Sequence, residues 1–416
     1  MPANRWLFKV KASRTQPPFY RWLIVGLTLV NQGISVGILV YSFALFVVPW
    51  LETFGVSRGE IMVAIFLMQF LGGLISPVVG RFLDLYSMRW LIIGGAVAMA
   101  LGLLLSSWAS AYWQIIVLHA LLLPLGMSLC GTLSSQTLVG KWFTEERGLA
   151  IGISAAGTSF GGFLFPLVTA ELLGQLDWRI TLQILALLTV VVMVPLNYWV
   201  LRISPPEAVA LDVPEPLPHE RPWTTPQILT TRMFWIPIAG LLPINMSFAA
   251  IQFNLGAYVS DLGFTQSTAA QLISIGSLSM IVGKFIFGGL GDHVDHRFLF
   301  WTMALSLTGA LLLYLGRPGY VALVSAAVLH GIATGGVMPM MGNVYAARFG
   351  TLSFGKVLGF VNMFTMMGSF GSLASGWLFD MTGSYDPVFW LLLMLLVPSV
   401  TIMFWLPPTP RRRSEV

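Results

Sequence analysis

One lysine lies deep inside an otherwise apolar stretch of the sequence. Lys284 belongs to the segment Ser277–Arg297, SLSMIVGKFIFGGLGDHVDHR, eight residues before Asp292 in the charged turn. At the rise of an α-helix, Lys284 is roughly 12 Å from that turn, and so near the middle of a bilayer core about 30 Å thick. An ionisable side chain at that depth is costly and points to a functional site. The alternative is that its long stem carries the ammonium group out to the headgroups.

Lys284 has no acidic partner in the apolar stretches. Each of the 17 acidic residues falls in a loop, in a turn or at the end of an apolar run. A buried cation without a counter-ion either sheds its proton or waits for an anion. A carboxylate substrate satisfies the second requirement, so the sequence predicts that Lys284 binds a small organic monoanion.

The composition excludes a soluble protein. Of the 416 residues, 56% are hydrophobic and 9% are charged, and the mean hydropathy is +0.81; soluble chains carry about 25% charged residues. The basic residues are scattered through short loops, which argues against nucleic-acid binding. Cys130 is the only cysteine, which excludes disulfides within the chain and cysteine-based zinc sites. We expect a polytopic membrane protein embedded in a lipid bilayer, with no metal and no cofactor.

The apolar residues form twelve runs, each about long enough for a membrane-spanning helix. These runs are approximately 22–50, 60–80, 90–108, 112–138, 147–169, 179–201, 233–257, 267–290, 298–316, 319–346, 353–379 and 387–406. The proline-rich segment between the sixth and seventh predicts an extended linker. The expected domains are an N-terminal six-helix half, residues 1–201, the linker, residues 202–231, and a C-terminal six-helix half, residues 232–416.

The basic residues predict the orientation of the chain. With the N-terminus in the cytoplasm, 18 of the 22 Lys and Arg residues lie on the cytoplasmic side, and Lys284 lies within a span. The other side carries only Arg58, Arg179 and Arg317. Because cytoplasmic loops are enriched in basic residues, we expect both termini and the linker to be cytoplasmic. The expected location is the plasma membrane, which in a bacterium is the inner membrane.

A repeated motif indicates that the two halves are related. The pattern Gly-x3-Asp-x4-Arg occurs at Gly80, Asp84 and Arg89 and again at Gly288, Asp292 and Arg297. The offsets 288 − 80 and 297 − 89 both equal 208. Parallel repeats of this kind place a substrate site at the midplane between the halves. The expected fold class is an all-α membrane protein with twelve transmembrane helices in two pseudo-symmetric six-helix bundles.

The same turns carry a resemblance to a known family. The segments Gly80–Asp84, GRFLD, and Gly288–Asp292, GGLGD, resemble loop signatures of the major facilitator superfamily. The segment Lys141–Gly157, KWFTEERGLAIGISAAG, is similar to the fifth-helix signature of its monocarboxylate transporter-type members, and the turns Phe54–Arg58 and Asp177–Arg179 also match that group. The resemblance covers essentially the whole chain and implies a transporter that works by alternating access. It also implies that Gly80, Asp84, Arg89, Gly288, Asp292 and Arg297 form a cytoplasmic latch that holds one state of the cycle.

The sequence departs from that group at two positions that bear on proton coupling. Well-studied proton-coupled members carry a lysine in helix 1, where this chain has Val40 and Tyr41. They also carry an acid four residues before a basic residue in helix 8; here Lys284 stands at the basic position and Met280 at that of the acid. The resemblance therefore supports anion binding better than it supports proton coupling.

Six further polar side chains fall near the expected midplane and are candidates for the substrate site. They are His330, Asn31, Gln32, Asn245, Thr158 and Asn362. A histidine there can bind a substrate or a proton, and the amides and the hydroxyl can line a polar cavity. Each can equally hold two helices together.

Glycines and prolines within the runs predict features of packing. The glycines near Gly157 and Gly161 have no basic partner for a phosphate, so close helix packing is expected there. Prolines lack a backbone donor and are expected to localise bends. Those within or near the runs are Pro77, Pro124, Pro166, Pro195, Pro243 and Pro339.

Other classes of function fit the sequence less well. Gly289–Asp292, GLGD, matches the G-x-G-D motif of intramembrane aspartyl proteases, which need a second aspartate facing the first. Asp292 lies at the membrane interface and no aspartate lies in mid-span. An intramembrane enzyme or a substrate sensor therefore remains only a remote alternative. We expect a monomeric transporter of a monocarboxylate, not an enzyme, that moves the anion with protons or else exchanges organic anions without them.

Overall fold

Helices are the only regular elements in the part of the chain that the structure describes. This computed structural model describes residues 18–203 and 223–408, apart from residues 144–145, 292 and 351–352. Within these ranges, twelve helical segments are long and apolar enough to cross a membrane, from Phe19–Phe54 to Asp386–Trp405. Each coincides with one of the twelve runs predicted from the sequence, and their ends differ by only a few residues. The predicted all-helical fold class is confirmed.

The N-terminal half contains the first six spans. Its elements are α1 (Pro18–Val36), the π-helical turn η1 (Gly37–Tyr41), α2 (Phe43–Phe54), α3 (Arg58–Leu85), α4 (Met88–Ser107), α5 (Tyr112–Cys130), α6 (Thr132–Trp142), α7 (Arg147–Gln175) and α8 (Trp178–Val200). A capping box fixes the start of α3, because Ser57 and Glu60 each bond the other's backbone N–H. Gly55, at φ 63°, ends α2 in the left-handed conformation that glycine adopts without strain.

The C-terminal half contains the other six spans. Its elements are α9 (Thr225–Thr230), α10 (Arg232–Asp261), α11 (Gln266–Leu290), α12 (His296–Tyr314), α13 (Tyr320–Gly335), α14 (Val337–Phe349), α15 (Phe354–Thr365), η2 (Met366–Ser369), α16 (Phe370–Thr382), α17 (Asp386–Ile402) and η3 (Met403–Trp405). Most of the predicted linker, residues 204–222, lies outside the described residues. Its last part is not extended but forms α9, which has Pro226 in its first turn, where a missing N–H is tolerated.

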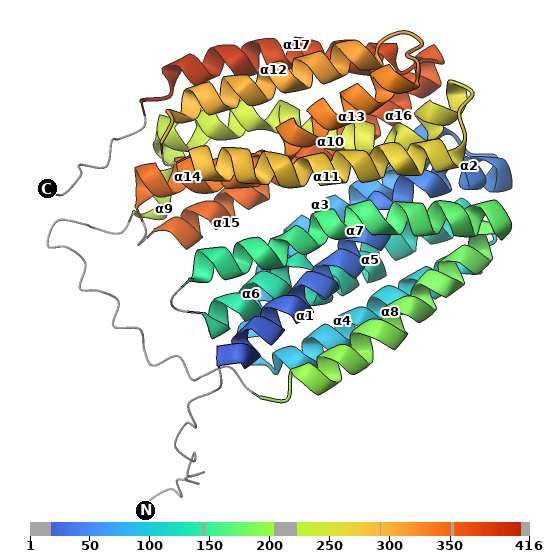
Figure 1. The fold of residues 1–416 in the computed structure, drawn as a ribbon, viewed down its shortest axis with the longest axis horizontal. Coiled ribbons are helices and arrows are strands. Elements are labelled where there is room, and N and C mark those ends of the chain that lie inside the picture. Colours follow the sequence, from blue (N-terminus) through green and yellow to red (C-terminus); the bar gives the residue numbers. More distant parts are fainter. Residues whose placement is uncertain (1–17, 144–145, 204–222, 292, 351–352, 409–416) are drawn as a thin grey trace, which may run out of the picture.

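The two halves lie side by side as two bundles (Figure 1). Within them, α4 packs against α5 and α8, and α11 packs against α13. The seam between the halves is formed by α7 with α11, α3 with α16, and α2 with α10. We call the end where α1 begins and α9 lies the inner end, and the end where α2 leads into α3 the outer end.

Several spans are interrupted near their middle, and only one of the interruptions falls next to a predicted proline. The first span changes register through η1, and the fourth breaks at Gly131 between α5 and α6. The tenth breaks at Gly336 between α13 and α14, and the eleventh passes through the 3₁₀ turn η2. Pro339 lies in the first turn of α14, just after the break at Gly336. The other predicted prolines lie inside continuous helices: Pro77, Pro124, Pro166, Pro195 and Pro243. Breaks inside a span leave backbone groups free to line a site.

Glycines bring α1 and α7 into backbone contact. A Cβ atom at Gly157 would lie 2.2 Å from the carbonyl oxygen of Leu29, and one at Gly161 would lie 2.0 Å from that of Gly33. No other residue type fits such an approach without moving a helix. The close packing predicted for these glycines is confirmed, and it fixes α7, whose opposite side faces α11.

Candidate functional site

The Lys284 side chain crosses the seam between the two halves. It extends from α11 to α7, where its Nζ donates to Ser159 Oγ at 2.8 Å and to Thr158 Oγ1 at 3.1 Å. A longer bond, 3.5 Å, reaches the carbonyl oxygen of Ala155. The Thr158 hydroxyl in turn donates to the same carbonyl at 2.8 Å. The ammonium group is therefore held at the seam, not drawn along α11 toward the inner headgroups.

Neutral oxygens are the partners of this ammonium group. Among the described residues, ion pairs join Arg58 to Asp261, Lys141 to Asp84 and Arg297 to Asp295, and none includes Lys284. Hydroxyl and carbonyl dipoles solvate a cation in part but leave its charge unneutralised. A carboxylate that reached Lys284 would form a charge-assisted hydrogen bond, which is about twice as strong as a neutral one.

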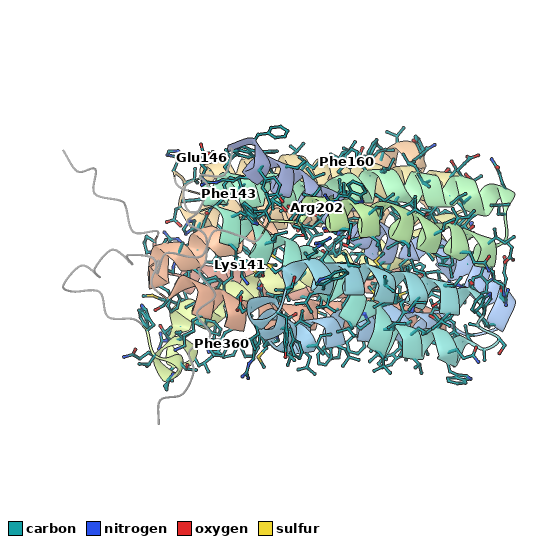
Figure 2. The ribbon with its side chains drawn as sticks, turned by 90° about the horizontal axis from the view of Figure 1, so that it is seen from below. Lys141, Phe143, Glu146, Phe160, Arg202 and Phe360 are labelled. Carbon is teal, nitrogen blue, oxygen red and sulfur yellow. The ribbon has the colours of Figure 1, made fainter. Side chains whose placement is uncertain are left out.

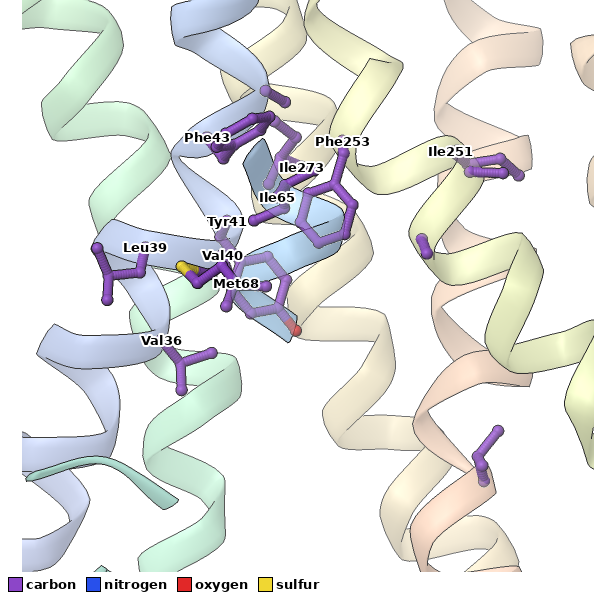
Figure 3. Close-up of a cluster of buried hydrophobic side chains, with 14 of the residues drawn as sticks. Val36, Leu39, Val40, Tyr41, Phe43, Ile65, Met68, Ile251, Phe253 and Ile273 are labelled. Carbon is purple, nitrogen blue, oxygen red and sulfur yellow. The ribbon is translucent and has the colours of Figure 1, made fainter. Parts of the chain in front are cut away.

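Tyr41 and Met280 form a neutral hydrogen-bonded pair, and Met280 lies one helical turn before Lys284 on α11. The Tyr41 hydroxyl, at the end of η1, donates to Met280 Sδ at 3.2 Å. Tyr41 is buried, and Figure 3 shows it among Val36, Val40 and Met68. In the resemblance noted above, Val40 and Tyr41 stand where the helix-1 lysine is expected, and Met280 stands where the helix-8 acid is expected. The structure thus brings the two departures into contact as a tyrosine–thioether pair.

His330 does not share the hydrogen bonds of Lys284 in the described structure. It is buried on α13, on the side that faces Ser247 of α10, and its Nε2 has no hydrogen-bond partner among the described residues. No hydrogen bond joins it to Lys284. An unpaired ring nitrogen at this depth is free to bind a ligand or a water molecule.

Asn31 and Gln32 bind to helices of their own half. Asn31 and Asn197 form a reciprocal amide pair between α1 and α8, with both N–H···O distances at 2.9 Å. The Gln32 Nε2 donates to the carbonyl and the hydroxyl oxygen of Ser154 on α7, at 2.9 and 2.7 Å. Both side chains are fully buried. These contacts link helices, but Gln32 Oε1 has no hydrogen-bond partner among the described residues and can still accept a bond from a ligand or water.

The remaining two candidates lie on α10 and α15. Asn245 is half-buried and its Nδ2 donates to the carbonyl oxygen of Leu241 at 3.3 Å, beside Gly368 of η2. Asn362 is exposed on α15, and its side chain has no hydrogen bond with a described residue. Of the six polar candidates, only Thr158 is hydrogen-bonded to Lys284.

A cavity that the sequence did not reveal lies between α3 and the break that separates α5 from α6. Its volume is about 190 Å³, and its lining includes Gln69, Ser128 and Thr132. None of these three side chains has a hydrogen-bond partner among the described residues. Met68, which Figure 3 shows beside Tyr41, lines the same cavity. Nothing in the local sequence pattern separates these three side chains from ordinary packing residues.

At the inner end, the repeated loop residues contact only their own half. Asp84 pairs with Lys141 at 3.0 Å, at the inner end of α6 (Figure 2). The Arg89 guanidinium lies 4.1 Å from the centre of the Tyr198 ring. Arg297 pairs with Asp295 at 2.9 Å, and Asp292 lies outside the described residues. Gly80 and Gly288 have room for a Cβ atom, the nearest contact being 3.5 Å from Gly288 to Pro339.

At the outer end, Arg58 ties the two halves together. Its guanidinium makes two bonds of 2.6 Å to the Asp261 carboxylate and donates to the Tyr385 hydroxyl at 2.9 Å. The carboxylate of Asp380 accepts from the backbone N–H groups of Arg58 and Gly59, at 3.0 and 2.8 Å, and so caps α3 from the other half. We call Arg58, Asp261, Asp380 and Tyr385 the outer cluster.

The outer cluster is partly buried and its phenol stays neutral. The Arg58 side chain is 12% exposed and that of Asp261 is 37% exposed. Burial raises the pKa of the Tyr385 phenol, which therefore keeps its proton and donates to Asn254 Oδ1 at 3.1 Å. The sequence analysis used Arg58 only as an orientation signal. The sequence did offer one clue: Arg58 is the first residue of a long apolar helix, on the side of the membrane that has few basic residues.

Comparison with known proteins identifies the family. A sequence model of the Major Facilitator Superfamily matches residues 32–321 and 257–416. Monocarboxylate transporter 13 of Rattus norvegicus is 27% identical over 410 residues, which cover 95% of this chain and 91% of that one. The fujikurins efflux protein of Gibberella fujikuroi is 27% identical over 291 residues, or 66% of this chain and 57% of that one.

A solved structure shares the fold. A bacterial homolog of the human lysosomal transporter Spinster, in an inward-facing and occupied conformation, superposes with a TM-score of 0.72. The match covers 94% of this chain and 97% of that one at 14% sequence identity, so it supports the fold alone. The chain belongs to the Major Facilitator Superfamily. It is a multi-pass membrane transporter and not an enzyme, which removes the protease alternative.

Proposed function

We propose that this protein is a secondary active transporter of a small organic monoanion, a monocarboxylate, with Lys284 as the charge that binds the carboxylate. The observation that carries the proposal is the position of its Nζ, which crosses the seam and is held by neutral oxygens of α7. A site shared by both halves is reshaped whenever the halves move, as alternating access requires. The similarity to a monocarboxylate transporter along most of the chain supports the same class of substrate.

In the proposed cycle, the two ends of the molecule open in turn. The outer cluster joins the halves in the conformation described here, while the inner loops bond only within each half. Opening at the outer end breaks the bonds of Arg58 and brings the inner loops together. Gly80, Asp84, Arg89, Gly288, Asp292 and Arg297 then act as the inner latch.

The energy source is a separate question that transport assays can answer. In the symport scheme, Lys284 takes up a proton together with the arriving carboxylate, and His330 is the reserve proton carrier. In the exchange scheme, Lys284 stays charged and crosses only when an anion neutralises it. For liposomes without internal organic anion, symport predicts that an inward proton gradient drives accumulation of a labelled monocarboxylate. Uptake that ignores the gradient and requires internal anion would reject symport and leave the anion site standing.

The proposed orientation has its own test. The side of the linker and the termini carries 18 basic residues and the opposite side carries three, so we expect the linker and the inner end to face the cytoplasm. Single cysteines at Glu215 and Ser384, in a Cys130→Ser background, should react with a membrane-impermeant maleimide from opposite sides of the membrane. Labelling of both from the same side would contradict the twelve-span topology.

A further inference from the structure

A cavity in the described part of the C-terminal half lies outside the seam. It has a volume of about 730 Å³ and is a groove over the first turns of α10, walled by α15 with η2 on one side and by the end of α17 with η3 on the other. Its lining is mostly apolar and includes Trp235, Leu242, Phe364 and Trp405. Figure 1 shows α9, α15 and the end of α17 at the inner end of the molecule. The groove therefore lies at the depth of one membrane leaflet.

The walls of this groove face lipid. Trp405 is 72% exposed and Met367 is 44% exposed, although both belong to membrane spans. Water would not wet so apolar a surface within a bilayer, so the hydrocarbon of the leaflet is what covers it. Trp235 and Trp405 lie near the inner membrane–water boundary. Tryptophan is enriched there because its ring is apolar and its N–H is polar. The Trp235 N–H donates to the Leu229 carbonyl oxygen at 2.7 Å, which fixes that ring along the edge of the groove.

A single unpaired cation stands at the mouth of the groove. Arg232 lines it, is exposed, and makes no ion pair or hydrogen bond with a described side chain. It is also the first residue of the 30-residue helix α10, whose N-cap Thr231 makes no side-chain cap. The first N–H groups of a helix have no partner inside it and favour an anion. The groove thus joins an anion-binding end to an apolar channel that enters the leaflet.

We propose that this groove binds an anionic membrane phospholipid, with its phosphate group at Arg232 and the start of α10 and one acyl chain along the groove. An amphiphile is the occupant that matches both parts, because a free phosphate would leave the apolar channel empty and a neutral lipid would leave Arg232 unpaired. Basic pockets between transmembrane helices bind such headgroups in other membrane proteins. This site is independent of Lys284 and of the transported anion.

Native mass spectrometry of the purified full-length protein tests the proposal. The probes are phosphatidylglycerol and phosphatidylcholine with identical acyl chains, each added at matched concentrations. The parental protein should retain the anionic lipid about fivefold more tightly than the zwitterionic one, the gain expected for one arginine near a headgroup. Arg232→Gln should remove that preference. The matched control is Arg202→Gln, since Arg202 lies at the same end but stacks 4.7 Å from the Trp199 ring, away from the groove.

A second variant tests the apolar half of the site. Ala239 lines the groove, so Ala239→Phe should fill it and weaken both lipids alike, with folding checked by monodisperse elution. Addition of inorganic phosphate alone should not displace the bound phospholipid. The proposal fails if the parental protein shows no preference between the two lipids, if Arg232→Gln retains the full preference, or if inorganic phosphate displaces the lipid. None of these outcomes depends on transport activity, so the proposed function stands or falls separately.

Discussion

Lys284→Gln should abolish transport of every monocarboxylate that the parental protein carries, while the protein remains folded and in the membrane. The shorter amide remains a polar hydrogen-bond donor facing α7 but removes the charge that the carboxylate needs. Removing one partner of a desolvated charge pair costs about 2–5 kcal/mol, so binding should fall by roughly 30-fold or more. Uptake of labelled acetate, lactate and pyruvate into liposomes would measure the loss.

Two further variants sharpen this result. Lys356→Gln is the matched control, because Lys356 is exposed at the inner end and, among the described residues, bonds the Trp223 carbonyl oxygen alone, at 3.4 Å. Lys284→Arg keeps the charge but presents a wider, planar group, so it should retain part of the binding with a lower transport rate. Transport by Lys284→Gln at the parental rate would show that the lysine only supports the packing of α11 against α7.

Asp261→Asn should open the outer end of the transporter. The change removes the charge partner of Arg58 and keeps the size of the side chain, so the two bonds of 2.6 Å across the seam are weakened. Hydrogen bonds to charged groups contribute about 1.5–3 kcal/mol each, and the outward-open population should rise about tenfold or more. A cysteine at Met62, which is fully buried beside Gly376 at the seam, reports this opening. Its reaction with an impermeant maleimide should accelerate in a Cys130→Ser background.

The control for the outer cluster comes from the same side of the membrane. Arg317 is exposed and makes no ion pair with a described residue, so Arg317→Gln should leave the Met62→Cys labelling rate unchanged. Arg58→Gln combined with Asp261→Asn should accelerate labelling little more than either change alone, because both remove the same interaction. Equal labelling rates in the parental protein and in Asp261→Asn would show that this cluster does not hold the outer end closed.

The twelve spans could be predicted because each depends on local composition. A run of about 20 apolar residues has few alternatives to a membrane helix, and the repeated loop motif predicted two halves. Helix interruptions were not predictable in the same way. The sequence favoured the prolines, yet of the six only Pro339 lies next to a break, the one at Gly336, and the break at Gly131 has no proline beside it. Neighbouring helices restore the hydrogen bonding around a proline in a span, so the proline alone does not decide where a helix ends.

The candidate site was only partly accessible from the sequence. The depth of Lys284 follows from its place in the apolar run, but its partners on α7 lie about 125 residues away in the chain. Such contacts depend on how the halves meet, which no local pattern encodes. Asn31 has the same polarity as a cavity residue, yet its amide pairs with that of Asn197 in its own half. The outer cluster escaped notice for a similar reason, since its four residues come from α3, α10, α16 and the turn before α17.

Ligand-dependent unfolding of the purified protein tests the central claim most directly, because it measures anion binding without the rest of the cycle. A monocarboxylate present at 100 times its dissociation constant should stabilise the parental protein by about 2.7 kcal/mol. The account predicts that acetate, lactate, pyruvate or a longer monocarboxylate produces this shift in the parental protein and in Lys356→Gln, and produces none in Lys284→Gln. Equal stabilisation of the parental protein and Lys284→Gln by the same acid would contradict it, because the carboxylate would then bind without the lysine.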